Sequence, residues 1–194
     1  MTTLKIIVAS TRPGSSGPAI AGWIAGAARR GTDFDSVEVL DLAEINLPFL
    51  DEPHHPKLGR YTKPHTLAWA REIDTADALV IVTPEYNSGF PAPLKNAIDF
   101  LHAEWQNKAL GMVTYGGGAS GGARAGRMLQ PVTTALGLVT AAHAVAISGA
   151  AGQVVAGEFV PTPADDASAN AMLAELAEID ADLRPVRVPL AVAG

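Results

Sequence analysis

Residues 78–101 read ALVIVTPEYNSGFPAPLKNAIDFL, and this order predicts a buried strand, a stiff turn and a helix. The strand expected over 78–83 is apolar up to Thr83, which is typical of a strand covered on both faces of a parallel sheet. Pro84, Pro91 and Pro93 stiffen the segment that follows. A helix is then expected over 92–101, so the stretch forms one strand–turn–helix unit of an α/β sheet.

The same unit recurs on both sides of this stretch. Further strands are expected over residues 4–9, 37–42, 110–115 and 139–147, and further helices over 18–30, 66–75, 123–136 and from 163 to Pro185. Strands that alternate with helices form a parallel sheet with helices on both faces. Five of them predict a flavodoxin-like, doubly wound sheet in the order 2-1-3-4-5, and we expect one domain over residues 1–194.

Two segments outside the strands have clear signatures. Residues 47–64 contain four prolines and predict a long surface loop, a kind of segment that is commonly functional. Thr162 is expected to cap the last helix, with Pro163 in its first turn. The expected inner face of that helix consists of Leu173, Leu176, Ile179 and Leu183.

Composition narrows the classes of function. Hydrophobic residues make up 48% of the chain and charged residues 18%, which is ample for a packed core. The net charge of −6 argues against nucleic acid as the main partner, because phosphate backbones are bound by clustered Lys and Arg. The chain has no cysteine, so thiol chemistry is excluded and a cytoplasmic location is expected. No apolar run approaches the length of a membrane span, so no membrane partner is expected.

The turn after the first strand, STRPGSSG at 10–17, resembles an anion cradle. Gly14 and Gly17 let the backbone approach a ligand, and the helix that begins at Pro18 directs its N–H groups and positive dipole end to the same place. Arg12 adds a forked cation suited to phosphate. Hydroxyl groups come from Ser10, Thr11, Ser15 and Ser16. The alternative is an ordinary Ser/Gly turn before a capped helix.

The turns after the third and fourth strands supply a candidate site for a flat ring. Tyr86 stands at a strand end, where it can stack on a planar cofactor, and Asn87 can bond a heterocycle; the alternative is a surface tyrosine. The turn YGGGASGG fits G-x-G-x-x-G literally, but that fingerprint belongs after the first strand with a carboxylate about 20 residues on. We therefore interpret its glycines as backbone that lies against a ring. Since the carboxyl ends of neighbouring parallel strands share one edge, the three turns should meet there.

At these residues the sequence resembles the NADPH-dependent FMN reductases of flavodoxin-like fold, which include quinone, chromate and azo reductases. The matching segments are PEYNSGFPAPLKNAID, STRPGSSGPAIAGW and VTYGGGASGGARA. The resemblance implies that the FMN phosphate is held by Ser10, Arg12, Ser15, Ser16, Gly17, Pro18 and Ala19. It implies ring contacts from Pro84, Glu85, Tyr86 and Asn87, and a pocket completed by Tyr115, Gly116 and Gly117. It also implies a homodimer or homotetramer, with the helix after PEYN near the interface.

The expected activity is transfer of electrons from NADPH or NADH through FMN to a small acceptor, by a ping-pong mechanism. The flavin would carry the chemistry, so no catalytic residue is named, and Glu85 is expected to pair with a basic residue or a neighbouring subunit. The alternatives are a flavodoxin-like electron carrier and a flavin-binding redox regulator. A phosphate-accepting receiver domain fits poorly, because Thr83 and Pro84 stand where it needs an aspartate.

Several conspicuous residues are expected to be structural. His54, His55 and His65 lack the spacing of metal ligands, so no metal is expected. Lys95 and Asp99, four apart on one helix, should form a surface pair. Trp69 and Trp105 are expected to pack in the core.

Overall fold

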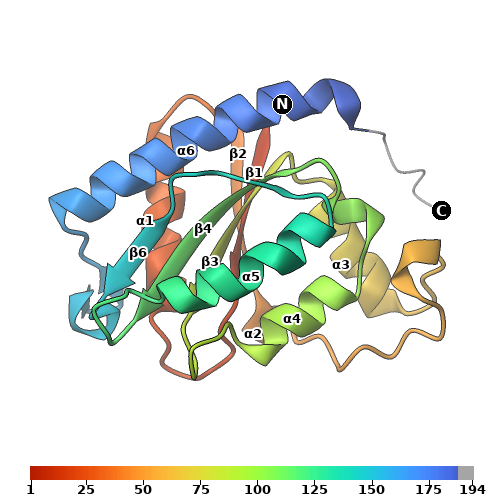
Figure 1. The fold of residues 1–194 in the computed structure, drawn as a ribbon, viewed down its shortest axis with the longest axis horizontal. Helices are drawn as coiled ribbons and strands as arrows, with labels where there is room; N and C mark the ends of the chain where they lie inside the picture. Colours follow the sequence, from red (N-terminus) through yellow and green to blue (C-terminus); the bar gives the residue numbers. More distant parts are fainter. Residues whose placement is uncertain (188–194) are drawn as a thin grey trace.

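The apolar segments pair into a parallel sheet in the order β2-β1-β3-β4-β5, which confirms the predicted topology (Figure 1). The structure, a computed structural model, describes residues 1–187, so the last seven residues of the domain expected over 1–194 lie outside the described residues. The strands are β1 (Thr3–Val8), β2 (Ser36–Asp41), β3 (Ala78–Pro84), β4 (Ala109–Gly116), β5 (Val139–Thr140) and β6 (Val145–Ser148). A hairpin of β7 (Val154–Val155) and β8 (Glu158–Phe159) stands apart from them.

Helices cover both faces of the sheet. They are α1 (Gly17–Arg30), α2 (Leu42–Ile45), α3 (Pro64–Asp74), α4 (Ala92–Asp99), α5 (Ala123–Ala135) and α6 (Pro163–Leu183), with 3₁₀ turns at Pro56–Leu58, Ala103–Trp105, Ala150–Gln153 and Arg184–Val186. One buried cluster joins α1 and α6 to the sheet, and a second joins α3, α4 and α5 to the other face. In the second cluster the rings of Trp69 and Trp105 pack edge to face, with their centroids 6.2 Å apart. Both side chains are buried, which confirms them as packing residues.

The prediction of one continuous fifth strand over 139–147 is wrong, because this segment forms two short strands, β5 and β6. Both pieces pair with β4, and the N–H of Ala141 still donates to the carbonyl of Leu110 at 2.9 Å, but residues 142–144 leave the ladder. The carboxylate of Glu175 on α6 accepts hydrogen bonds from the backbone N–H groups of Ala142 and His143, each at 2.8 Å. These bonds lower the pKa of Glu175, and the bond from His143 makes the largest contribution. They also replace the strand hydrogen bonds that the break removes.

Helix α6 begins as predicted, and its predicted inner face is confirmed in part. The Thr162 side chain and Asp165 form a capping box, which confirms Thr162 as the cap. Leu173 and Leu176 are buried as expected, whereas Ile179 and Leu183 are only partly buried. The remaining buried positions include Met172 and a carboxylate, Asp180, whose side chain is 1% exposed.

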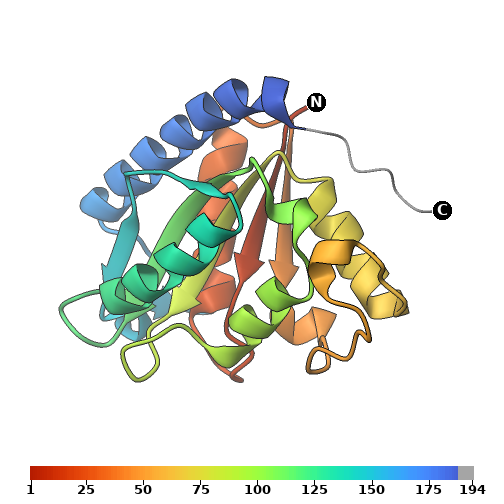
Figure 2. The ribbon, with the colours of Figure 1, turned by 45° about the vertical axis from the view of Figure 1, so that its right-hand side comes forward.

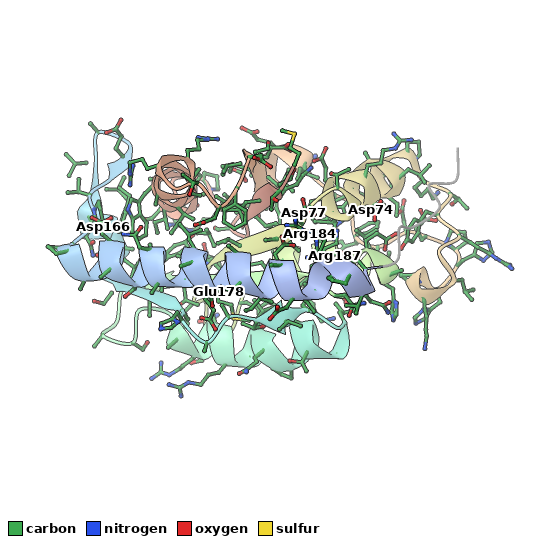
Figure 3. All side chains as sticks on the ribbon, turned by 90° about the horizontal axis from the view of Figure 1, so that it is seen from above. Asp74, Asp77, Asp166, Glu178, Arg184 and Arg187 are labelled. Atoms are coloured by element: carbon green, nitrogen blue, oxygen red, sulfur yellow. The ribbon has the colours of Figure 1, made fainter. Side chains whose placement is uncertain are left out.

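Asp180, Arg187 and Asp77 form an ion-paired cluster that we call the C-terminal latch. Arg187 pairs with Asp180 and, at 3.1 Å, with Asp77, and it donates to the carbonyl of Asn107 at 2.8 Å. Asp77 also accepts from the backbone N–H of Thr3 at 2.8 Å, so the latch joins the end of α6 to the edge of the sheet where β1 and β3 begin. Figure 3 shows Arg184 and Arg187 beside Asp77 at this end of the helix.

The proline-rich segment 47–64 is a loop, as predicted, and its own residues hold it in place. The carboxylate of Glu52 accepts hydrogen bonds from the backbone N–H groups of Thr62 and Lys63, at 2.9–3.0 Å. Partial burial alone would raise the pKa of Glu52, but the hydrogen bonds lower it to about 2. The bonds close the loop onto the start of α3. In the described part of the chain, no helix combines the length and the apolar character that crossing a bilayer requires.

Candidate functional site

The three predicted turns meet at the edge where the strands end, below the sheet in Figure 2. The hydroxyls of Ser10 and Tyr86 share a hydrogen bond of 2.8 Å, which joins the first turn to the second. The backbone N–H of Glu85 donates to the carbonyl of Tyr115 at 3.0 Å, which joins the second turn to the third. The predicted convergence is confirmed by these contacts.

The first turn leaves the N-terminus of α1 open. Ser16 occupies the cap position, but its side chain makes no capping hydrogen bond, and the first turn of the helix contains no acidic residue. The alternative of an ordinary capped helix is therefore wrong. Uncapped N–H groups and the positive end of the helix dipole favour an anion at this position.

Arg12 stands at the rim of this turn. Its backbone N–H donates to Ser10 Oγ at 3.3 Å, and its side-chain Nε donates to Tyr86 Oη at 3.4 Å. The guanidinium lies in solvent, and no carboxylate in the described residues 1–187 pairs with it. Its charge can therefore turn toward an anion held by the turn.

The second turn is a two-residue hairpin. Tyr86 and Gly89 exchange two backbone hydrogen bonds, of 2.8 and 2.9 Å, around Asn87 and Ser88. Both central residues have positive φ, 50° and 68°, which is the geometry of a type I′ turn. Tyr86 precedes this turn and remains 37% exposed, with its hydroxyl tied to the first turn. Its stacking on a flat ring remains a prediction.

Glu85 pairs with a basic residue, as predicted. Its Oε1 lies 3.2 Å from a guanidinium nitrogen of Arg124, and its Oε2 accepts from the Arg124 backbone N–H at 3.2 Å. The carboxylate thus closes the N-terminus of α5 and fixes the second turn against the third. A group bound in this way is poorly placed to transfer protons.

The glycines of the third turn have two different structural roles: one allows close packing, and two others lie in open space. A Cβ atom on Gly121, where φ is +55°, would lie 2.6 Å from the carbonyl carbon of Ala146, so this glycine lets the turn pack on β6. Around Gly117 and Gly118 there is nothing within 4 Å of such an atom. This open pair fits the prediction of backbone free to lie against a ring, and the ring contacts of Gly116 and Gly117 remain a prediction.

Tyr115 reaches across the site from the end of β4 to the first turn. A Cβ atom on Gly17 would lie only 3.0 Å from Tyr115 Oη, so the absence of a side chain there lets the hydroxyl approach the turn. That hydroxyl is buried and has no hydrogen-bond partner among the described residues. Burial raises the pKa of Tyr115 to about 12.

A cleft that the sequence did not reveal opens beside the first turn. It has a volume of about 630 Å³ and lies between Thr11, α2, residues 46–49 and the start of α4. The Asn96 side chain donates to the carbonyl of Pro48 at 2.7 Å and accepts from the N–H of Leu50 at 3.0 Å. These two bonds hold the backbone on both sides of Phe49, whose side chain is 86% exposed. In the sequence, this cleft was indicated only by Phe49, a bulky apolar residue within the proline-rich loop.

The remaining candidates have ordinary partners. Among residues 1–187, no three His, Asp or Glu side chains are grouped so that they could hold a metal ion. His65 pairs with Asp51 at 2.9 Å. Lys95 and Asp99 form the predicted surface pair, at 2.6 Å.

Comparison with known proteins agrees with this geometry. The sequence model of the family described as NADPH-dependent FMN reductase matches residues 2–152. An NAD(P)H-dependent FMN reductase of Schizosaccharomyces pombe is 44% identical over 120 residues, covering 61% of this chain and 60% of that protein. A 2-hydroxy-1,4-benzoquinone reductase of a Burkholderia species is 31% identical over 108 residues, covering 56% and 54%. The matched part thus spans little more than half the length of these relatives.

A solved structure supports the fold alone. FerB of Paracoccus denitrificans, described as a flavoenzyme NAD(P)H:(acceptor) oxidoreductase, superposes with a TM-score of 0.72. The match covers 94% of this chain and 98% of that one, at 21% sequence identity.

Proposed function

Because the chain belongs to the NADPH-dependent FMN reductase family, we propose that it binds FMN and uses NAD(P)H to reduce a small acceptor. The observation that carries the proposal is the meeting of an uncapped, acid-free helix N-terminus with two further turns at one edge of the sheet. We propose that residues 1–194 form a single flavodoxin-like domain around this site.

The residues present fit FMN. The first turn offers uncapped N–H groups, several hydroxyls and Arg12, which no carboxylate within residues 1–187 pairs, and together these suit a phosphate monoester. A buried tyrosine hydroxyl that has no partner in the described part of the chain faces the same turn. The phosphate would be held by Ser10, Arg12, Ser15, Ser16, Gly17, Pro18 and Ala19, and the ring by Pro84, Glu85, Tyr86, Asn87, Tyr115, Gly116 and Gly117. The site has no adenine-binding fingerprint, so FMN rather than FAD is the expected cofactor.

Bound FMN would supply the transfer of hydride and electrons, and the protein residues provide position and environment. Tyr86 and Ser10 fix the first turn against the second, while Glu85 and Arg124 fix the second against the third. Glu85 is held by two donors, and we assign no residue as a general acid or base. The donor and the acceptor would use one opening in turn, which gives ping-pong kinetics.

The acceptor is proposed to be a small apolar molecule of the quinone class. The cleft beside Thr11 borders the first turn and the start of α4, which follows the second turn. Its lining is mainly apolar, and the amide of Asn96 is already engaged. The exposed ring of Phe49 offers a face on which a planar acceptor can stack.

Two measurements test the proposal. The purified chain is reconstituted with FMN, FAD or riboflavin, and the bound flavin is released and identified by chromatography. Initial rates of NADPH and NADH oxidation are then measured with a quinone, an azo dye, chromate, a ferric chelate and free flavin, and parallel double-reciprocal lines would support the ping-pong order. Stoichiometric FAD would contradict the cofactor assignment. Bound FMN without turnover of any acceptor would indicate an electron carrier or a redox regulator instead.

The assembly in solution is a separate part of the proposal. We propose a homodimer or homotetramer, to be measured by light scattering of the flavin-loaded protein. A monomer over the working concentration range would contradict it.

A further inference from the structure

Tyr115 places an unused hydrogen-bond donor inside the site. Its side chain is 6% exposed, and its Oη is buried without a partner among residues 1–187. The hydroxyls of Ser15 and Ser10 lie near enough to lower its pKa, but neither meets the geometry of a hydrogen bond. A buried hydroxyl without a partner is unfavourable, and in native proteins such a group commonly faces a ligand or an ordered water.

The surroundings of this hydroxyl favour an anion. Gly17 allows Oη to lie against the backbone of the first turn, where the N-terminus of α1 is uncapped and free of acidic residues. The nearby carboxylate of Glu85 is held by Arg124. Because burial keeps the hydroxyl protonated well above neutral pH, it can act there only as a donor or as a neutral acceptor.

We propose that the hydroxyl of Tyr115 donates a hydrogen bond to the phosphate of FMN and thereby selects phosphorylated flavin over riboflavin. The assignment rests on the proposed function, and it gives the hydroxyl of Tyr115 a specificity role at the phosphate in addition to the place of this residue in the ring pocket. Tyr115 is a binding residue in this scheme and takes no part in electron transfer.

The test is Tyr115→Phe in the full chain after removal of bound flavin. Titration by flavin fluorescence should show about a tenfold weaker affinity for FMN and an unchanged affinity for riboflavin, since one hydrogen bond to a charged group is lost. The thermal midpoint of the flavin-free variant should equal or exceed that of the wild type, because the change removes an unsatisfied buried hydroxyl. A merely structural tyrosine would give the opposite sign in this second measurement.

Tyr86→Phe is the matched control, since the hydroxyl of Tyr86 already has a partner in Ser10. It loosens the first turn without removing the donor proposed for the phosphate, so the FMN affinity should fall less than in Tyr115→Phe. If Tyr115→Phe fails to fold, Gly17→Ala provides a second test. The added methyl group would lie 2.9 Å from Val8 Cγ1 and 3.0 Å from Tyr115 Oη, so both must move, and FMN affinity should fall more than riboflavin affinity.

Equal losses of FMN and riboflavin affinity, or no loss, would overturn the assignment. A rise in KM for NADPH but not for NADH would also overturn it, because the hydroxyl would then contact the 2′-phosphate of the donor. Wild-type protein that binds neither flavin would instead contradict the proposed function, so the two failures are distinguishable.

Discussion

Replacing Arg187 with methionine should lower the melting temperature of the chain, because it leaves a buried carboxylate short of a partner. The side chain of Asp180 is 1% exposed and that of Arg187 is 15% exposed. In Arg187→Met the Oδ1 atom of Asp180 loses its cation, and only the exposed Arg184 remains, on Oδ2. Methionine keeps much of the aliphatic volume, so the change removes the guanidinium, with its bonds to Asp180, Asp77 and the Asn107 carbonyl, at little cost in packing.

The expected cost follows from the burial of the pair. Removing one partner of a buried ion pair costs about 3–5 kcal/mol, and the partial exposure of Arg187 places this case near 2–3 kcal/mol. For a chain of this size each kcal/mol lowers the melting temperature by about 2–4 °C, so a fall of roughly 5–10 °C is expected. Flavin affinity should not change, because the C-terminal latch lies at the edge of the sheet opposite the three turns (Figure 2).

Calorimetry of three variants checks this reasoning. Arg184→Met is the matched control: it removes a cation from the same carboxylate but from an exposed position, and it should leave the melting temperature close to that of the wild type. Asp180→Leu combined with Arg187→Met should recover much of the loss, since the buried carboxylate of Asp180 is then absent as well. An unchanged midpoint in Arg187→Met, or a double variant less stable than the single one, would refute the argument.

Three further predictions concern the site and its loop. Arg12→Ala should weaken FMN binding by about 1.5–3 kcal/mol and leave riboflavin binding nearly unchanged, and equal losses in a fluorescence titration would mean that Arg12 acts through folding. Phe49→Ala should raise the KM for an apolar quinone several-fold without changing the affinity for FMN. Leu58 is exposed but does not line the cleft, so Leu58→Ala should change neither value. A wild-type KM in Phe49→Ala would show that the acceptor does not use the cleft. Because the folded-state pKa of Glu52 is about 2, below its ordinary value of 4.5, its stabilising effect is complete above pH 4.5 and is lost as the pH falls toward 2. Thermal midpoints measured from pH 6 downward should therefore fall further in the wild type than in Glu52→Gln, and parallel curves would count against this role.

The sheet was predictable because burial on both faces leaves an uninterrupted apolar run. Strand β3 showed such a run, and β1 and β4 showed it apart from Lys5 and Thr114; the order of the strands followed from the alternation with helices. The break between β5 and β6 was not predictable, because residues 141–144 are mostly alanine. It depends on Glu175, more than 30 residues later in the chain, whose carboxylate replaces the missing strand bonds.

Charged and polar groups in the interior were the features that sequence patterns missed. Asp180 lies on a helix where a charge would ordinarily face solvent, and its burial depends on Arg187, beyond the end of that helix. In the site, the turns were identified from their glycine and proline content, but the direction of the Tyr115 hydroxyl depends on how β4 and α1 pack. Contacts of this kind require coordinates, because they join segments that no local pattern relates.

The position of the C-terminal latch has a consequence for how this chain can evolve. The ion pairs of the buried Asp180 lie at one edge of the sheet, while the turns proposed to bind cofactor and acceptor lie at the other. Mutations in the turns therefore need not reduce the stability that the latch provides. A lineage with this arrangement can change its acceptor through drift and selection in the turns while it inherits the same scaffold.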